Sequence, residues 1–467
     1  RPDLTSHTGI PDFWLGKGHS APHVAYSSLS HRDAVDYTDY GIAPWGNFRA
    51  PAFLGMGNQA GQKTRCSYMT TSRHSRVATA FGAAGRGLDG LSLTLSDPHP
   101  AGEDAALLAI FERFGPFFSA LEPLPDAAFY YSGWTEQASV ILHDLARMRR
   151  PGMLLSQSDV RAGKLAGVKV LVLAGIGEGE PSDIVEAFAK FAADGGTILK
   201  DGNCAASLPG KPLGFAYDKT QVHNGWGLAY PNGEWEFAHL WENFKKTREA
   251  PLTAAFAAAR PAPVTTPTPD VVLSPLAATE SILCFSINQT LVPLEVPGKW
   301  RQHAVLPRKS TLLVEEGWHV HDLLAGQEVA VADSPAGRGV PLDFTRCEGA
   351  IHLLTRRKPE SLAIRTERTG PHGLKLAAWL ADGKGAPLPD PLPFEVTLRD
   401  KNARSLFHAF VAASPALTFN VPVPAAAADA ELELVVRDLV LGCEARQAVD
   451  PAAVATIPTA DGAEIVG

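Results

Sequence analysis

Two aspartates, Asp36 and Asp39, alternate with tyrosines shortly before Trp45 near the start of the chain. Binding sites for small polar molecules combine aromatic surfaces with a few placed polar groups, and a sugar ring offers both an apolar face and hydroxyls to such a site. This stretch is therefore a candidate sugar subsite. The same residues also fit a solvated loop whose aromatic rings close the edge of a domain, and both interpretations stay open.

A second acidic position, Asp97, shares a proline-rich turn with His99. The turn follows residues 88–95, an apolar run that predicts a buried strand. In a barrel of alternating strands and helices, catalytic side chains lie at the carboxyl ends of the strands, which would place both residues on the active face. The alternative is that Asp97 caps the amphipathic helix predicted over residues 101–121.

Three other groups could do chemistry, but their surroundings argue against it. Cys204 follows a predicted strand but lacks the glycines of a nucleophile elbow, so we predict a buried structural thiol. His319 and His321 would share one strand face, but no third metal ligand is evident from the spacing. The glycine-rich residues 175–179 lack the spacing and the lysine of a phosphate-binding loop. We therefore expect no metal and no other cofactor.

The composition is that of a multidomain globular protein. At about 100–200 residues per domain, the 467 residues correspond to about three or four domains. A net charge of −8 gives no overall attraction to nucleic acid or to an anionic membrane. Runs of about 18 apolar residues are absent, so we expect no membrane span. The five cysteines form no C-x-x-C pair, and their odd number predicts at least one free thiol unless it pairs between chains.

Strand and helix patterns alternate most clearly between residues 126 and 206. Strands are predicted at residues 127–131, 167–173 and 197–200, and helices at 136–148 and 181–193. Gly195 and Gly196 predict a left-handed end to the last helix, after which the next strand begins at once. Such alternation implies parallel strands joined by right-handed crossovers. Helices are predicted again at residues 235–260, followed by an extended, proline-rich linker at 261–269.

Beyond this linker, short strands alternate with turns and predict β-sandwich modules. The complete prediction is a multidomain protein with both α/β and all-β parts. The first 125 residues read as loop-rich α/β structure.

Residues 168–202 resemble the trimerisation domain of β-galactosidases, which has a glutamine-amidotransferase-like (flavodoxin-like) fold. Residues 83–132 look like the last strand and helix of a (β/α)8 glycosidase barrel that runs into that domain. Residues 285–288 (FSIN) and 320–326 (VHDLLAG) look like strands of the accessory β-domains in these enzymes. The resemblance implies the following domains: the C-terminal part of a barrel at 1–125, a flavodoxin-like domain with a helical extension at 126–270, a β-sandwich-like domain at 271–365, and a second, Ig-like β-sandwich with the tail at 366–467.

The sequence departs from this family in two ways. A complete barrel needs about 250 residues, but only about 125 precede the flavodoxin-like segment. We therefore expect that half or more of the barrel lies on another polypeptide or has been removed. The family's nucleophile is a glutamate near the end of the seventh barrel strand. The resemblance places its counterpart in residues 53–59, which contain no acid; Asn58 stands there instead. The resemblance places the catalytic acid/base on the fourth barrel strand, which lies outside the portion of the barrel expected in this chain.

Two functional hypotheses follow. The first is the C-terminal portion of a glycosidase-like protein that acts on or binds carbohydrate, with its catalytic carboxylates largely outside this chain. The second is a non-catalytic structural or assembly subunit that retains the hydrolase domain order. The partners expected are a carbohydrate and either an N-terminal polypeptide that completes the barrel or further copies of the chain. Export to the periplasm or beyond the cell is expected, with the cytoplasm as the alternative.

Overall fold

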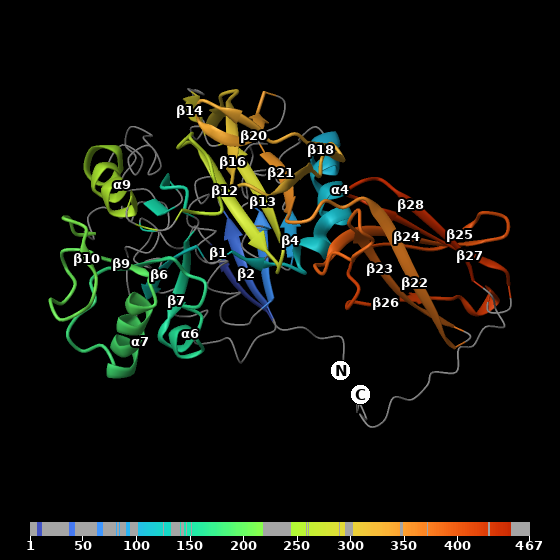
Figure 1. The fold of residues 1–467 in the computed structure, drawn as a ribbon, viewed down its shortest axis with the longest axis horizontal. Helices are drawn as coiled ribbons and strands as arrows, with labels where there is room; N and C mark the ends of the chain where they lie inside the picture. Colours follow the sequence, from blue (N-terminus) through green and yellow to red (C-terminus); the bar gives the residue numbers. More distant parts are fainter. Residues whose placement is uncertain are drawn as a thin grey trace.

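Figure 1 shows the computed structural model of the chain. The residues it describes are 7–11, 37–42, 63–68, 81, 84, 90–93, 101–124, 126–131, 141, 144–145, 147–150, 152–217, 244–257, 259, 261–288, 290–294, 302–345, 349–370, 372–427 and 430–449. Strands in several separate sheets are the predominant elements of these segments, and helices are few. Among the helices of these segments, none combines the length and the apolar character that a membrane crossing requires.

The first four strands form one parallel sheet, in the order in which they occur along the chain. They are β1 (His7–Pro11), β2 (Tyr37–Ile42), β3 (Lys63–Tyr68) and β4 (Gly90–Leu93). β4 confirms the strand predicted at 88–95 in a shorter form. β2 corrects the interpretation of residues 36–40 as a solvated loop, because most of that stretch pairs with strands on both sides.

Helix α4 (Ala101–Phe118) follows this sheet and confirms the helix predicted at 101–121. Its buried rings, Phe114, Phe117 and Phe118, belong to the same apolar core as Phe285 of the six-stranded sheet described below, and the Phe118 and Phe285 ring centroids are 5.0 Å apart. The helix lies between that sheet and the C-terminal strands (Figure 1). Strand β5 (Glu122–Pro123) then joins the six-stranded sheet directly.

Five parallel strands form the next sheet, in the order β10-β9-β8-β6-β7. Its elements are β6 (Ala127–Tyr131), β7 (Gly152–Ser156), α6 (Gln157–Arg161), β8 (Val170–Leu173), α7 (Ser182–Ala193), β9 (Thr197–Lys200) and β10 (Lys211–Pro212). The predicted strands and the helix predicted at 181–193 are confirmed within a few residues, whereas β7 was not predicted. Of the helix predicted at 136–148, the described residues 141, 144, 145 and 147 are helical. All four residues of β8 are buried, as expected for a parallel strand covered on both faces.

Helix α7 and its exit show how the sequence sets this arrangement. Ile184, Phe188 and Phe191 repeat at helical spacing and are buried against the sheet. The helix ends at Ala193, and Gly195 follows with a φ of 92°, the left-handed conformation that glycine adopts without strain. A Cβ atom on Gly196 would lie 2.3 Å from the Phe191 ring, so only glycine lets the chain turn beneath that ring into β9.

The proline-rich segment at 261–269 is not the free linker that its composition predicts. It follows a π-helical turn, η3 (Phe244–Arg248), and α9 (Glu249–Ala257). Its centre forms β11 (Val264–Thr265), which pairs with β16 (Lys309–Val314). The guanidinium of Arg147 donates to the Pro269 carbonyl at 3.1 Å, and that of Arg149 donates to the Thr266 carbonyl at 3.4 Å. The segment is therefore held against the five-stranded domain.

Two antiparallel sheets form the next module and share one apolar core. The six-stranded sheet runs β18 (Gln327–Val329), β17 (His319–Asp322), β21 (Gly349–Thr355), β13 (Ser281–Asn288), β12 (Val271–Ala277), β5. The four-stranded sheet runs β11, β16 (Lys309–Val314), β20 (Gly337–Asp343), β19 (Ala332–Ser334), and a separate hairpin pairs β14 (Leu291–Leu294) with β15 (Gln302–Val305). The all-β character predicted for this region is confirmed.

The C-terminal module also contains two antiparallel sheets. One runs β22 (Ser361–Gly370), β23 (Gly373–Ala381), β26 (Phe419–Pro422), and the other runs β25 (Ser405–Ala413), β24 (Leu392–Asp400), β27 (Leu432–Asp438), β28 (Glu444–Val449). A short 3-10 turn, η4 (Ala425–Ala427), precedes β27. Inward residues of both sheets, such as Leu376 and Phe394, belong to the core that also contains the α4 rings.

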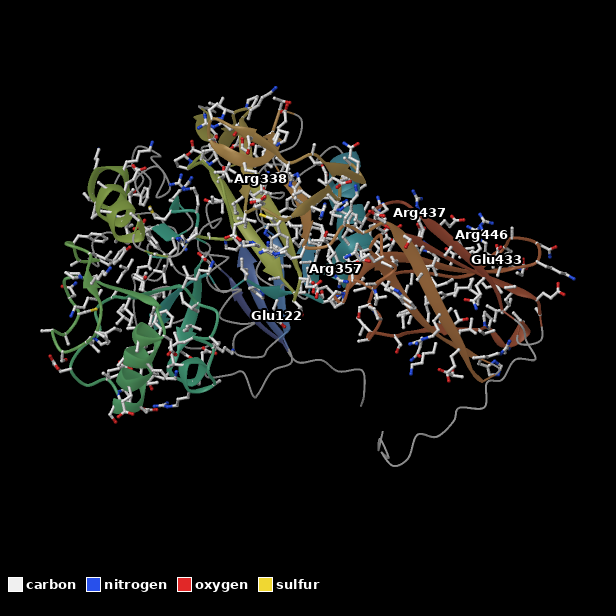
Figure 2. The ribbon with its side chains drawn as sticks, in the orientation of Figure 1. Glu122, Arg338, Arg357, Glu433, Arg437 and Arg446 are labelled. Atoms are coloured by element: carbon white, nitrogen blue, oxygen red, sulfur yellow. The ribbon has the colours of Figure 1, made fainter. Side chains whose placement is uncertain are left out.

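The junction between these two modules is polar. Arg357, labelled in Figure 2, donates to the Glu280 carboxylate at 2.9 Å and to the Pro387 carbonyl at 2.9 Å. The buried Asp390 carboxylate of the C-terminal module accepts three hydrogen bonds from the turn between β12 and β13, from Thr279 N, Glu280 N and Ser281 Oγ. These contacts tie the two modules at their surfaces, beside the shared core.

Candidate functional site

The side chains predicted to bind a sugar are not placed by the described part of the chain. Asp39 lies in β2, where its backbone is aligned with Gly9 of β1 and Arg65 of β3. The other predicted site residues lie outside the described segments: Asp36, Trp45, Asn58, Asp97 and His99. A sugar subsite at the N-terminal sheet therefore stays a prediction.

Among the described residues, polar groups gather at the carboxyl ends of the five parallel strands. The chain leaves β6 for β7 on one side and later returns to β8 on the other side. In open parallel sheets, ligands bind outside the carboxyl ends of the strands at such a reversal of strand order. This edge is therefore the place where the described fold would present a site.

Tyr130, Gln157 and Glu180 form the centre of this edge. The Tyr130 hydroxyl donates to the Glu180 carboxylate, and the Gln157 amide donates to the same oxygen at 3.0 Å. The Tyr130 ring packs edge-on against Phe188, with the ring centroids 4.9 Å apart. Burial, together with the Glu180 carboxylate, raises the pKa of Tyr130 well above its ordinary value. The phenol therefore remains a hydrogen-bond donor at neutral pH.

The neighbouring carboxylates are also engaged. Asp183, in the first turn of α7, accepts from the Arg161 guanidinium at 2.7 Å, and this hydrogen bond lowers the pKa of Asp183. Glu178 accepts from Ser207 Oγ at 2.7 Å. A general acid needs a carboxyl group with a raised pKa. The arrangement is thus better suited to holding the loops at this edge together than to donating a proton.

The two loops at β8 and β9 are joined by Asp201, which follows β9 and is buried. Its carboxylate accepts from the backbone N–H groups of Gly175 at 3.0 Å, Asn203 at 3.1 Å and Tyr217 at 3.0 Å. Nearby, burial is the main cause that raises the pKa of the Cys204 thiol to about 11. A thiol that stays protonated at neutral pH is a poor nucleophile, which supports the structural role predicted for Cys204. The side chain is half-buried, however, and not fully buried as the sequence predicts.

One buried ion pair was not predicted from the sequence. The Arg248 guanidinium donates to the Asp144 carboxylate at 2.5 Å and 3.2 Å, and both side chains are 1% exposed. The Tyr217 hydroxyl donates to the same carboxylate at 3.2 Å. The pair fixes η3 to the five-stranded domain, since breaking it would leave a charge buried. The signal in the sequence was an acid on the apolar side of a predicted helix, but its partner lies 104 residues away.

Metal-binding side chains do not assemble within the described segments. His319 and His321 lie on β17 as the sequence predicts, but no group of three or more His, Cys, Asp or Glu side chains suited to a metal ion occurs in these segments. The three described cysteines, Cys204, Cys284 and Cys443, are free thiols.

A groove of about 630 Å³ lies at the opposite, amino-terminal end of the five-stranded sheet. Its lining includes Val160, Leu165 and Phe191, with Lys169, Lys190 and Asp194 among its polar residues. Lys190 pairs with Asp194 at 2.6 Å, and Lys169 donates to the Pro261 carbonyl at 2.8 Å. The charged groups of the groove are thus bound within the chain.

Comparison with known proteins gives similarity only at the level of structure. No family model matches the chain, and no curated protein matches it. A cold-adapted β-galactosidase from Rahnella sp. R3 is similar with a TM-score of 0.42 and 10% identity, over 76% of this chain and 64% of that one. The adhesin domain of Epf from Streptococcus pyogenes has a TM-score of 0.18 and 9% identity, over 39% and 80%. A β-D-glucuronidase from Dictyoglomus thermophilum has a TM-score of 0.13 and 10% identity, over 37% and 36%.

Glycoside hydrolases are thus among the structural neighbours, and the chain spans 64% of the length of the Rahnella enzyme. With identities near 10% and TM-scores below 0.5, these likenesses concern the fold alone. The function has to be argued from the residues and the topology of this chain.

Proposed function

We propose that the chain is part of a glycosidase-like protein that acts on or binds carbohydrate, with its catalytic carboxylates outside the residues described. The supporting observation is the order of architectures along the chain. A parallel sheet in chain order, β1 to β4, comes first; a five-stranded parallel sheet follows, and antiparallel modules come last. This is the succession that the resemblance to β-galactosidases implies.

Each α/β part supports this proposal separately. Parallel strands that neighbour one another in chain order are what consecutive strand–helix units of a (β/α)8 barrel produce, and β4 is followed by a helix, α4. The second sheet, taken from its first strand in chain order, has the spatial order 2-1-3-4-5, which is the flavodoxin-like order. We therefore assign a partial barrel to the first segment and a flavodoxin-like domain to the second.

In this proposal the catalytic residues do not lie at the five-stranded parallel sheet. A retaining glycosidase needs two carboxyl groups about 5–5.5 Å apart, one of them a nucleophile and the other an acid. Glu178, Glu180 and Asp183 all accept hydrogen bonds from neighbouring side chains, and the pKa of Asp183 is lowered rather than raised. The proposed sugar subsite is the N-terminal sheet, with Asp36 and Trp45 as its contacts.

Glycan binding by the 467-residue chain tests this proposal. A titration of the chain with neutral oligosaccharides, measured by isothermal calorimetry, should show binding. The variant Trp45→Ala should bind about tenfold more weakly or worse, since a stacked tryptophan contributes more than about 1 kcal/mol. Asp333→Ala, an exposed acid in β19, is the matched control and should bind as the wild type does. Absence of binding to any glycan would overturn the proposal. Hydrolysis of aryl glycosides by this chain alone would refute the location of the carboxylates.

A second candidate, a non-catalytic assembly subunit, is favoured by one observation. The polar groups at the carboxyl edge of the five-stranded sheet are bound to one another, as in a domain that has kept its shape without a reaction to perform. Light scattering distinguishes this candidate, which predicts a defined oligomer with no affinity for glycans. Export to the periplasm or the cell exterior is compatible with either candidate function, and we propose it as the location of the protein.

A further inference from the structure

The edge of the six-stranded sheet contains a histidine whose imidazole ring has no hydrogen-bond partner among the described residues. His321 of β17 is 0% exposed, and neither of its ring nitrogens has a hydrogen-bond partner in the described part of the chain. Its neighbours across the sheet are Leu353 of β21 and Glu328 of β18. A neutral imidazole can be buried at moderate cost, but an imidazolium cannot be buried there without a new partner.

Of the charged groups that act on His321, the Glu328 carboxylate is contacted by both Lys358 and His319. Glu328 accepts from the Lys358 ammonium at 2.9 Å and lies 3.7 Å from His319 Nδ1. The hydrogen bond to Lys358 lowers the pKa of Glu328 and raises that of Lys358. Glu328, the anion that favours a charge on His321, is thus already paired, and His319 and Lys358 both oppose a further positive charge on His321.

A second buried histidine lies in the same sheet. His352 of β21 is 3% exposed, its Nδ1 has no hydrogen-bond partner among the described residues, and its aligned neighbour on β17 is Asp322. Alternation along the two strands places His352 on the face opposite to His321. Burial lowers the pKa of both histidines, while Asp322 opposes this effect at His352 and Glu328 opposes it at His321.

We propose that the β17–β18 hairpin is an acid-labile edge, which opens when His321 takes up a proton. The hairpin is the natural place for opening, because β18 has three residues, pairs only with β17 and lies at the end of the sheet. A histidine that is harder to protonate when folded stabilises the closed state at pH values above about 6.5. Below that value the open state binds the proton first, so the closed state loses its advantage as the pH falls.

Hydrogen exchange of the full chain at pH 7.5 and pH 5.0 tests this device. After correction for the intrinsic exchange rate, amides of residues 319–329 should exchange at least tenfold faster at pH 5.0. In His321→Leu, which removes the titrating group at similar volume, this acceleration should disappear. His408→Gln is the matched control, because His408 is an exposed histidine that contacts Glu395 in the other module. It should retain the wild-type response.

A second measurement keeps the proposal testable if His321→Leu does not fold. In Glu328→Gln the anion that favours a charge on His321 is lost, so the closed state is still harder to protonate and the acceleration between pH 7.5 and pH 5.0 should be larger than in the wild type. The imidazole signal of His321 should also titrate with a midpoint below the ordinary histidine value of about 6.5. An acceleration that persists unchanged in His321→Leu, or a His321 midpoint at or above that value, would overturn the proposal.

Discussion

Replacing Asp390 by alanine should weaken the junction between the two β modules more than any surface substitution. Its carboxylate is 4% exposed and accepts hydrogen bonds at 3.0, 2.7 and 2.7 Å from Thr279 N, Glu280 N and Ser281 Oγ. Each hydrogen bond to a charged group contributes about 1.5–3 kcal/mol, and the donors left behind are partly re-solvated. We therefore expect a loss of about 3–5 kcal/mol in the free energy of opening this junction.

Hydrogen exchange at the turn between β12 and β13 measures this loss locally, which matters because a multidomain chain need not unfold in one step. A loss of about 3 kcal/mol accelerates exchange of the turn amides by about two orders of magnitude, since about 1.4 kcal/mol corresponds to a factor of ten. Asp390→Asn keeps one acceptor and should fall between Asp390→Ala and the wild type. Asp333→Ala, at an exposed position, is the control. Exchange within threefold of the wild type in Asp390→Ala would refute the reasoning.

Three further predictions concern the five-stranded domain. Gly196→Ala should destabilise it by about 2–3 kcal/mol in chemical denaturation because the added Cβ meets the Phe191 ring, whereas Gly177→Ala, with open space around it, should cost under about 1 kcal/mol. The Cys204 thiol should react with a disulfide reagent slowly at pH 7 and faster as the pH rises toward 11; rapid labelling at pH 7 would contradict its raised pKa. Tyr130→Phe should lower the free energy of unfolding by about 1–2 kcal/mol, because Glu180 loses a donor, and an unchanged value would show that this hydrogen bond is not needed.

The sequence predicted elements where one local signal decided the structure. Residues 170–173 are β-branched and leucine residues without interruption, and such a run forms a parallel strand that is buried on both faces. The signal for helix α7 was equally clear, because its apolar spacing and the glycine pair that follows it agree. β7 gave no comparable signal, since a proline and a glycine precede only a few apolar residues there.

Contacts between residues that are far apart in the chain could not be predicted from the sequence. The proline-rich segment was interpreted as a linker by composition, but the guanidinium groups of Arg147 and Arg149 fix its carbonyls from more than 100 residues away. The pairing of Asp144 with Arg248 likewise depends on how η3 folds back. The candidate sugar residues other than Asp39 lie outside the described residues, and their arrangement stays a prediction.

Helix α4 lies between the N-terminal parallel sheet and the β17–β18 hairpin along the path by which one could affect the other. Its buried rings share a core with Leu323, the residue that directly follows β17, and its N-terminus lies a few residues after β4 of the parallel sheet. Opening of the β17–β18 hairpin at acid pH would therefore loosen the surface on which α4 rests. If the N-terminal sheet binds carbohydrate, affinity should fall between pH 7.5 and pH 5.0 in the wild type and fall less in His321→Leu. Equal pH dependence in both proteins would show that the hairpin and the N-terminal sheet act independently.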